Sequence, residues 1–336
     1  MILAGDIGGT SARFAYFELR NGHLTVVAER TYRSRELATL ESAVKKFIIE
    51  QNIRAEVACF GIAGPVNDRK VVTPNLPWHI DAAVLERELG ISHVSLLNDL
   101  EANAHGLAEL SDADFAVLAA GAPGAIGNRA VISAGTGLGE AGLYWDGATH
   151  HPFPCEGGHA DFAPTNDLQI ELLQYLMTKF GHVSIERVLS GPGLYNIYQF
   201  LRDSGKGEEE PWLREEMQTR DPSACVSEYG LSGKSQLCAL ALDDFVDIYG
   251  AEAGNFGLKT MALGGVYVGG GIAPKILPKL QQSRFMQAFK NKGRLGALLE
   301  QMPVRVILND KTALLGAAHV ALLYGGVTKE AKVFAT

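Results

Sequence analysis

The chain has 336 residues, of which 47% are hydrophobic and 20% are charged, and its formal net charge is −8. This length and composition are typical of a folded protein with two domains. The acidic balance argues against a general nucleic-acid-binding surface, which is normally basic. No segment approaches the roughly 18 unbroken apolar residues that a membrane-spanning helix needs. We therefore expect neither a nucleic-acid partner nor a membrane partner.

The start of the chain and its cysteines indicate the compartment. The first six residues contain no basic residue, so they do not resemble a signal peptide, and we expect a cytoplasmic location. The four cysteines are widely spaced and form no C-x-x-C pair, which predicts reduced thiols and no structural zinc site. These cysteines are Cys59, Cys155, Cys225 and Cys238.

The first third of the chain alternates strand-like and helix-like patterns. Ser34 is expected to cap a helix that carries Leu37 to Ile48, and Asp81 to cap one that ends at Gly90. The last strand of this part delivers Asn98 and Asp99 to its carboxyl end, where ligands bind in open α/β sheets. The expected strands are residues 1–4, 12–19, 24–32, 57–62 and 94–97.

A second unit is expected from about residue 110, again with alternating strands and helices. Residues 203–236 are polar and predict a mobile excursion. The expected strands are residues 115–119, 129–134, 140–145, 266–268 and 304–308. The expected helices are residues 167–180, 240–263 and 312–324, and a further one that opens at Ala273. The chain is therefore α/β.

Three glycine-rich turns each follow a predicted strand: Asp6–Thr10, Gly135–Gly139 and Gly269–Gly271. Glycine permits φ > 0 and lets a phosphate approach backbone N–H groups without meeting a Cβ. The carboxylate of Asp6 at the first turn predicts a divalent cation between it and the phosphate. An ordinary hairpin turn is the alternative for this segment. The similarity of the first two turns suggests duplicated phosphate-binding domains.

A dinucleotide site is the competing explanation for the glycine turns. That site needs G-x-G-x-x-G at the start of a helix, whereas the residues after Gly139 predict a strand. We therefore favour a nucleoside triphosphate.

A set of motifs in a fixed order then resembles the bacterial glucokinases of the hexokinase–actin superfamily, from residue 1 to about residue 320. The motifs are Gly5–Arg13, Leu97–Leu100, Gly135–Gly139, Glu156–His159 and Gly269–Ile272, with Phe162–Pro164 and Glu186–Gly193 in support. The ROK-type sugar kinases usually carry a cysteine-rich zinc motif after the segment that matches His159. This chain has no cysteine there, which favours the glucokinase branch proper.

The resemblance implies two RNase H-like α/β domains that flank a deep cleft. The small domain would comprise residues 1–108 and 312–336, with the C-terminal helix packed back on it, and the large domain residues 109–311. It also implies ATP-dependent phosphorylation of the glucose 6-hydroxyl, which feeds glycolysis, with Mg²⁺ as the metal. Family habit suggests a homodimer.

The resemblance assigns Asp99 as the general base that accepts the proton of the sugar hydroxyl, a role suited to a carboxylate at a strand end. Helix capping is the alternative role for Asp99. Glu186 is expected early in a helix capped by Ser184, so helix-dipole complementarity is its alternative role. The implied sugar contacts are Asn98, Glu156, His159, Glu186, Asn75, Gly64 and Pro65. The implied nucleotide contacts are Asp6, Gly8, Gly9, Thr10, Gly135, Thr136, Gly137, Gly270 and Gly271, with Asp6 also at the metal and Arg13 a weaker candidate.

Other functions stay open at this point. A sugar kinase with another hexose preference is the nearest, since single hydrogen-bond misfits decide between hexoses. A sugar-sensing regulator on the same fold would need a DNA-binding segment, for which the early first strand leaves no room. An actin-like ATPase would not need the sugar contacts.

Overall fold

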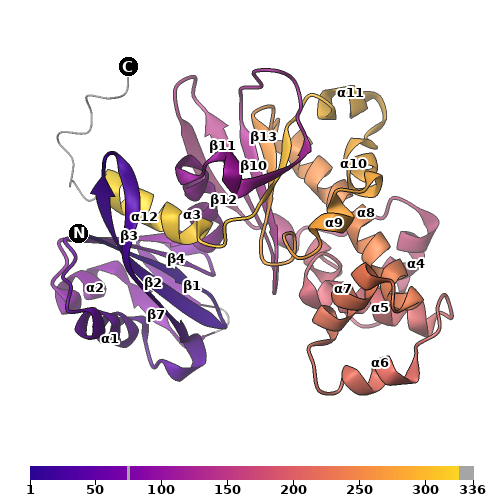
Figure 1. The fold of residues 1–336 in the computed structure, drawn as a ribbon, viewed down its shortest axis with the longest axis horizontal. Coiled ribbons are helices and arrows are strands. Elements are labelled where there is room, and N and C mark those ends of the chain that lie inside the picture. Colours follow the sequence, from indigo (N-terminus) through magenta and orange to yellow (C-terminus); the bar gives the residue numbers. More distant parts are fainter. Residues whose placement is uncertain (74–75, 325–336) are drawn as a thin grey trace. The chain divides into compact units, whose positions relative to one another are not determined.

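The computed structural model describes residues 1–73 and 76–324. Its internal contacts divide the chain into two compact units (Figure 1). Unit 1 comprises Met1–Ala113 and the chain from Asn309, and unit 2 comprises Asp114–Leu308. The predicted boundaries were 108/109 and 311/312, so each change of unit differs from its prediction by a few residues.

The sheet of unit 1 has the strand order β3-β2-β1-β4-β8. β1 pairs antiparallel with β2 and parallel with β4, which pairs parallel with β8. The carboxyl ends of β1, β4 and β8 therefore share one edge. These strands are β1 (Ile2–Ile7), β2 (Ser11–Arg20), β3 (His23–Arg33), β4 (Val57–Ile62) and β8 (His93–Asn98). A small sheet contains β5 (Val66–Asn67), β6 (Lys70–Val72) and β7 (His79–Asp81).

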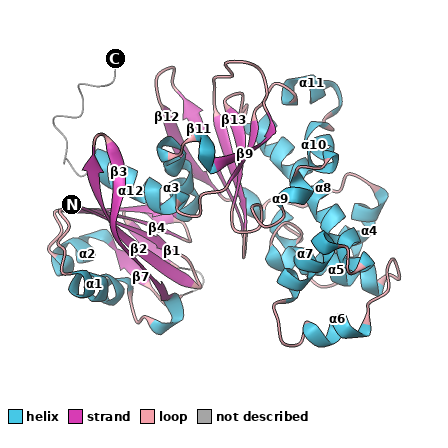
Figure 2. Cartoon of the chain, viewed as in Figure 1, coloured by secondary structure: helices cyan, strands magenta, loops and turns pink. Residues whose placement is uncertain are grey.

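Helices cover both faces of this sheet (Figure 2). One face packs on α1 (Leu40–Gln51) and α2 (Ala82–Leu89) through a core that includes Phe14, Phe47 and Leu85. The other packs on α3 (Asp99–Gly106) and α12 (Thr312–Tyr324). The two latter helices cross closely, because a Cβ on Gly316 would lie 1.8 Å from the carbonyl oxygen of Ala102. Short 3-10 turns lie at Ser34–Glu36, Leu107–Glu109 and Asp112–Asp114.

The sheet of unit 2 repeats the plan of unit 1, with the order β12-β11-β10-β13-β14-β9. β10 pairs antiparallel with β11 and parallel with β13, as β1 does with β2 and β4. The topology is therefore duplicated. The strands are β9 (Phe115–Ala119), β10 (Arg129–Ala134), β11 (Leu138–Trp145), β12 (His150–Cys155), β13 (Gly265–Gly269) and β14 (Val304–Ile307).

The long helix α8 (Gln236–Thr260) packs its buried residues against one face of this sheet, within a core that includes Ile132, Val268 and Phe245. The other helices are α4 (Asp167–Met177), α5 (Gly191–Asp203), α6 (Pro211–Glu216), α7 (Pro222–Ser232), α9 (Leu277–Leu280), α10 (Ser283–Lys290) and α11 (Gly296–Leu299). Further 3-10 turns lie at Gly157–His159, Ile185–Arg187 and Gly293–Leu295.

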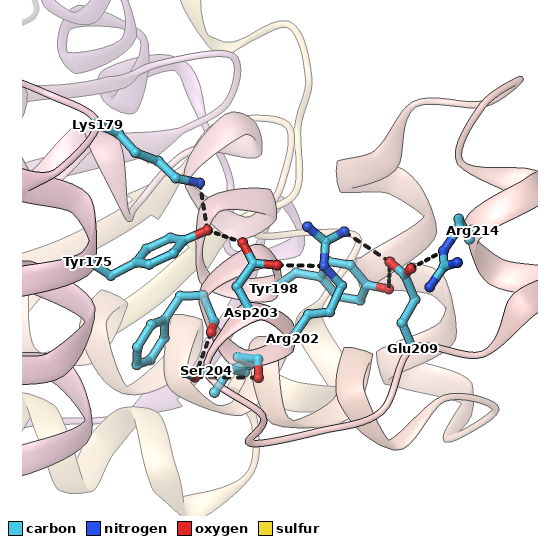
Figure 3. Close-up of polar contacts among 10 residues, drawn as sticks. Tyr175, Lys179, Tyr198, Arg202, Asp203, Ser204, Glu209 and Arg214 are labelled. Atoms are coloured by element: carbon cyan, nitrogen blue, oxygen red, sulfur yellow. Dashed lines mark hydrogen bonds and ion pairs between the residues drawn. The ribbon is translucent and has the colours of Figure 1, made fainter.

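The excursion expected at 203–236 is largely helical. The segment contains α6 and α7, which bury Leu213 and Tyr229. Figure 3 shows how its start is held: Glu209 accepts hydrogen bonds from Tyr198 at 3.0 Å and from Arg202 at 3.1 Å, and also from Arg214. The charged residues of the segment thus form ion pairs, and its apolar residues pack in the core of unit 2.

Three local predictions also differ from the structure. α1 begins at Leu40 with Thr39 as its N-cap, so Ser34 does not cap it. The helix expected from Ala273 begins only at Leu277, after a series of turns. Glu186 lies in a 3-10 turn in which Ser184 makes no side-chain cap bond, rather than in a capped helix. The predicted caps at Asp81 and Gly90 are confirmed.

Candidate active site

The first glycine turn is fixed from both sides. The N–H of Gly8 donates to the carbonyl of Ser11 at 2.9 Å, which closes the turn between β1 and β2. The buried Ser34 donates from its hydroxyl to the carbonyl of Gly8 at 2.7 Å and from its N–H to that of Thr10 at 3.0 Å. Ser34 is thus a support of the turn, a role that its position after a strand did not reveal.

Asp6 lies on β1 one residue before the end of the strand, opposite Arg13 on β2 and Gly61 on β4. The pKa of its carboxyl group is raised to about 6, mainly by desolvation and then by the negative charges of Asp99 and Asp310, which Arg13 opposes. Carboxylates thus crowd this edge of the sheet. A cation would relieve their mutual repulsion.

Arg13 is the cation already present there. Its Nη2 lies 3.1 Å from the Asp310 carboxylate, its Nη1 donates to the Asp310 carbonyl at 3.1 Å, and its Nε lies 3.8 Å from Glu29. Arg13 therefore ties β2 to the start of α12. Sequence reasoning did not single out Asp310. Asn309-Asp310 after β14 repeats Asn98-Asp99 after β8, and this repeat was the available signal.

Asn98 and Asp99 lie where β8 passes into α3. Asn98 is the N-cap: its Oδ1 accepts from the N–H groups of Leu100 at 2.9 Å and Glu101 at 3.4 Å. Asp99 is the first helical residue, and its Oδ1 also accepts from Leu100, at 3.0 Å. The capping role considered for Asp99 thus belongs mainly to Asn98.

The amide of Asn98 also holds the loop after β4. Its Nδ2 donates to the carbonyl of Gly64 at 3.2 Å, and Gly64 has a φ of 129° that strongly favours glycine. The structure thus brings two predicted sugar contacts together, with the exposed Pro65 next in the chain. Asn75, another predicted contact, lies outside the described residues.

In unit 2 three predicted segments meet at Leu138, the first residue of β11. Its N–H donates to Oε2 of Glu186 at 2.9 Å. A Cβ on Gly137 would lie 2.6 Å from the same oxygen, and one on Gly158 would lie 2.1 Å from the Leu138 carbonyl. Glycine is required at Gly158, where the contact is with backbone, and the second turn, the Glu186 segment and the Glu156–His159 segment pack together.

Glu156 precedes the 3-10 turn at Gly157–His159 and His159 ends it, so the segment is not an α-helix. Their side chains are mostly exposed, with 4.0 Å between His159 Nε2 and Glu156 Oε2. A hydrogen bond of 2.8 Å from the Ile185 N–H to the Ala160 carbonyl joins this turn to the Glu186 segment. Two acceptors and an imidazole thus lie on neighbouring loops, as recognition of hydroxyl groups requires.

A carboxylate that the sequence analysis did not consider supports this turn. Glu140 on β11 is 1% exposed, and a Cβ on Gly157 would lie 1.8 Å from its Oε2. The pKa of Glu140 is raised to about 8, mainly by burial and then by the charge of Glu252, which Lys259 opposes. The sequence alone does not reveal that the side chain of a charged strand residue such as Glu140 points into the protein.

The third glycine turn lies against the second. Gly270 has a φ of 80°, and a Cβ there would lie 2.2 Å from the carbonyl of Ala134 at the end of β10. The fully buried Tyr249 of α8 links the same two strand ends, since its hydroxyl accepts from the Ala134 N–H at 3.3 Å and donates to the Gly269 carbonyl at 3.2 Å. Nothing lies within 4 Å of a Cβ built on Gly135 or Gly271, so these turns leave open space.

Each unit therefore gathers its predicted residues at the carboxyl edge of its sheet. Unit 1 contributes Asp6, Gly8, Gly9, Thr10, Gly64, Asn98 and Asp99, and unit 2 contributes Gly135, Thr136, Gly137, Glu156, His159, Glu186, Gly270 and Gly271. Over residues 1–73 and 76–324, no group of three or more His, Cys, Asp or Glu side chains is arranged to hold a metal ion. No helix in the same ranges is long and apolar enough to cross a membrane.

Comparisons with known proteins identify the family. Residues 3–323 match the family model described as Glucokinase. A curated glucokinase from Nostoc sp. (strain PCC 7120) is 42% identical over 337 residues, which cover 96% of this chain and 98% of the relative.

Solved structures agree with this match. The crystal structure of glucokinase from an Antarctic psychrotroph has 31% identity and a TM-score of 0.81, with 96% of this chain and 98% of that chain covered. A ROK family glucokinase from Streptomyces griseus, solved with glucose and AMPPNP, has 18% identity, a TM-score of 0.66 and coverage of 96% and 99%, and so shares the fold. The chain belongs to the glucokinase family.

Proposed function

We propose that this protein transfers the terminal phosphoryl group of ATP to the 6-hydroxyl of glucose and forms glucose 6-phosphate, at the entry to glycolysis. The match of residues 3–323 to the glucokinase family carries this proposal. The glucose and AMPPNP in the Streptomyces griseus neighbour support a sugar and a nucleotide as ligands of this fold.

Asp99 is proposed as the general base. In the reaction, the glucose 6-oxygen forms a bond to the γ-phosphorus, the bond from that phosphorus to the bridging oxygen breaks, and ADP leaves. The hydroxyl proton passes to the Asp99 carboxylate, which also orients the oxygen for attack. Because Asp99 is the first residue of α3 and Asn98 fixes that helix start, the carboxylate is held in a defined direction.

The glycine turns of both units are proposed to bind the phosphates of ATP, with Gly270 and Gly271 at the adenosine. Gly8, Gly9 and Thr10 on one turn and Gly135, Thr136 and Gly137 on the other offer backbone N–H groups to oxyanions. Mg²⁺ would be held by ATP and by Asp6, whose carboxylate lies in an excess of negative charge, and would neutralise phosphate charge during transfer.

The sugar hydroxyls are proposed to be bound by donor and acceptor atoms that are not used in hydrogen bonds within the protein. Asn98 already uses its oxygen for capping and one N–H for Gly64, so its second N–H is the group left for glucose. Glu186 uses Oε2 for Leu138 and retains Oε1 as an acceptor. Glu156 and His159 add an acceptor and an imidazole, and Gly64, Pro65 and Asn75 complete the proposed set.

A panel of hexoses with the Asp99→Asn variant tests this proposal. We expect ATP-dependent turnover of glucose by the wild-type protein, and at least about a hundredfold slower turnover by the variant, with glucose binding retained. Isothermal titration with glucose checks the binding. Near-normal turnover by the variant would remove Asp99 from the mechanism.

The panel also separates the alternatives. A higher kcat/KM for mannose or fructose than for glucose would assign another hexose. ATP hydrolysis without any sugar would indicate an actin-like ATPase, and glucose binding without turnover would indicate a sensor. A homodimer and a cytoplasmic location are part of the proposal, and the molar mass in solution from light scattering tests the first.

A further inference from the structure

Glu140 on β11 takes no part in the proposed reaction, yet it is a buried acid next to two of the proposed sugar contacts. Its side chain is 1% exposed. In the sheet it lies opposite Ile132 of β10 and Cys155 of β12. Paired residues of neighbouring strands point to the same face, and Ile132 belongs to the core that includes α8. The Glu140 side chain therefore lies on the α8 side of the sheet.

The carboxyl group of Glu140 contacts the turn that carries these sugar contacts. A Cβ built on Gly157 would lie 1.8 Å from Glu140 Oε2. Since a Cβ takes the place of one glycine hydrogen, that hydrogen of Gly157 points at the carboxyl oxygen, as in a Cα–H···O contact. Gly157 follows Glu156 directly and lies two residues before His159. The carboxyl group thus contacts the backbone between the two sugar contacts.

The directions of Glu156 and His159 depend on the backbone of this turn. Their side chains are 63% and 66% exposed, so few contacts of their own hold them. The turn packs against β11 at the Leu138 carbonyl, through Gly158, and at the Glu140 carboxyl group. The first of these contacts is made by backbone. The second is made by a side chain, so a substitution of Glu140 can change the position of the turn.

Charged groups of α8 face Glu140 and keep its carboxyl group under the turn. These groups are Glu252 and Lys259. Glu252 is held within its own helix, because Asn255 donates to its Oε2 at 2.9 Å and Lys259 Nζ lies 3.5 Å from its Oε1. Burial and the charge of Glu252 favour the neutral form of Glu140. A neutral carboxyl group can lie close to the turn without repelling the carboxylate of Glu156.

We propose that Glu140 is a positioning residue for glucose, whose carboxyl group lies against Gly157 and sets the direction in which Glu156 and His159 face the sugar. This inference rests on the proposed function, and Glu140 itself takes no chemical step. A displaced turn would weaken the binding of the sugar in the ground state and in the transition state alike. The expected signature of its loss is a higher KM for glucose at a nearly constant kcat.

Steady-state kinetics of the full chain with glucose and Mg-ATP test the proposal. Glu140→Ala should raise the KM for glucose about tenfold, with kcat and the KM for ATP changed less than about threefold. Glu140→Gln keeps the shape of the side chain and should restore the KM for glucose to within about threefold of the wild-type value. A normal KM for glucose in Glu140→Ala would refute the role of Glu140.

The matched control is Leu143→Ala, which truncates another buried side chain of β11, three residues further along and on the opposite face of the sheet. It should lower the stability of the protein without changing the KM for glucose. An equal rise of that KM in Leu143→Ala and Glu140→Ala would show that any damage to the strand has this effect, and would refute a specific role of the carboxyl group.

A double-mutant cycle tests the contact itself. Gly157 does not have a positive φ, so alanine fits its backbone. The added Cβ would collide with Oε2 of Glu140 but would lie 3.4 Å from its Cβ, which is close to an ordinary contact. Gly157→Ala should therefore raise the KM for glucose at least about tenfold, and adding Glu140→Ala should lower it again at least about threefold. Independent effects of the two substitutions would refute the contact, as would a normal KM in Gly157→Ala alone, which needs no substitution of Glu140.

Failure of the proposed function would give a different result. If the wild-type protein does not phosphorylate glucose, that function and this inference are both refuted. Turnover by the wild-type protein together with a normal KM in Glu140→Ala refutes the inference alone. Isothermal titration with glucose needs no turnover and should show the same loss of affinity, about tenfold, in Glu140→Ala.

Discussion

Strand β1 of unit 1 and strand β10 of unit 2 hold the same place in their sheets. Asp6 lies one residue before the end of β1 and next to Gly61 of the parallel neighbour, and Ser133 lies one residue before the end of β10 and next to Gly269. Both strands then enter a glycine turn. The backbone plan is therefore shared, and the side chain at this position distinguishes the two turns.

The electrostatic surroundings of these two positions differ. Asp6 lies among the charges of Asp99, Asp310 and Arg13, whereas the hydroxyl of Ser133 is buried and has no hydrogen-bond partner in the described parts of the chain. A carboxylate next to the first turn suits a cation, and a hydroxyl next to the second does not add charge. We propose that both of the duplicated turns bind phosphate and that only the first, through Asp6, also holds the metal.

The first prediction tests this asymmetry with equivalent variants. Asp6→Asn should lower kcat about a hundredfold and raise the Mg²⁺ concentration needed for half-maximal rate, because the carboxylate proposed to hold the metal is lost. Ser133→Ala should change kcat less than threefold. Steady-state rates over a range of Mg²⁺ concentrations measure both effects, and equal losses in the two variants would show that the turns share one role.

The second prediction compares the close helix crossings of the two units. An added Cβ on Gly316 would meet the Ala102 carbonyl between α12 and α3 at 1.8 Å, and one on Gly254 would meet the Phe289 carbonyl between α8 and α10 at 2.4 Å. Alanine at either position should lower the free energy of unfolding by about 2.5 kcal/mol, because the helices must separate.

The activities of these two variants should differ. α3 begins at Asp99, so Gly316→Ala should also reduce kcat about tenfold in the folded protein, since small displacements of a catalytic group are costly. Gly254→Ala should leave kcat unchanged. Denaturant unfolding and assays well below the melting temperature give the two readouts. A normal kcat for Gly316→Ala would show that the close crossing of α3 and α12 does not set the position of Asp99.

The third prediction concerns the buried carboxyl group of unit 2. Because the pKa of Glu140 is about 8 in the folded protein and lies near 4.5 in the unfolded chain, the folded state keeps a proton that the unfolded state releases between these values. The stability contribution of Glu140 therefore falls as pH rises through this window. Relative to Glu140→Gln, which stays neutral, the wild-type protein should lose about 2 kcal/mol between pH 5 and pH 7.

Denaturant unfolding at several pH values measures this difference, with Glu36→Gln as the control at an exposed glutamate. That control should follow the wild-type protein across the range. Parallel pH profiles of wild type and Glu140→Gln would show that Glu140 is ionised throughout. The turn at Gly157 would then rest on a charge rather than on a neutral acid.

The sequence predicted those parts of the fold that depend on neighbouring residues. Apolar runs that end in glycine gave β1, β10 and β13 with their turns, and the capping residues Asp81 and Gly90 set the ends of α2. Ser34 and Thr39 are both good capping residues, and only the tertiary contact of Ser34 with Gly8 decides between them. Composition did not predict the helices at 203–236, because their few apolar residues pack in the core of unit 2 and the many charged residues form ion pairs.

For the candidate site, the sequence supplied the residues but not their neighbours. Glu186 was predicted from resemblance, yet its hydrogen bond to Leu138 joins positions 48 residues apart and requires the folded unit. Glu140 and Tyr249 escaped notice because their burial depends on sheet register and on packing of α8. The pairing of Asp310 with Arg13 spans most of the chain, although the repeated Asn-Asp pair hinted at it.

The last prediction concerns the hydrogen bonds that join the carboxyl ends of two parallel strands, β1 and β4 in unit 1 and β10 and β13 in unit 2. In unit 1 the N–H of Ala63 donates directly to the Ile7 carbonyl at 3.1 Å, whereas unit 2 uses the hydroxyl of Tyr249 between Ala134 and Gly269. Tyr249→Phe should cost about 1 kcal/mol and raise the KM for ATP severalfold, because the second and third turns lose their shared hydrogen bond. Tyr198→Phe removes another buried hydroxyl, bonded to Glu209 away from the turns, and should lower stability without changing the KM. An unchanged KM in both variants would mean that the backbone alone sets the spacing of these turns.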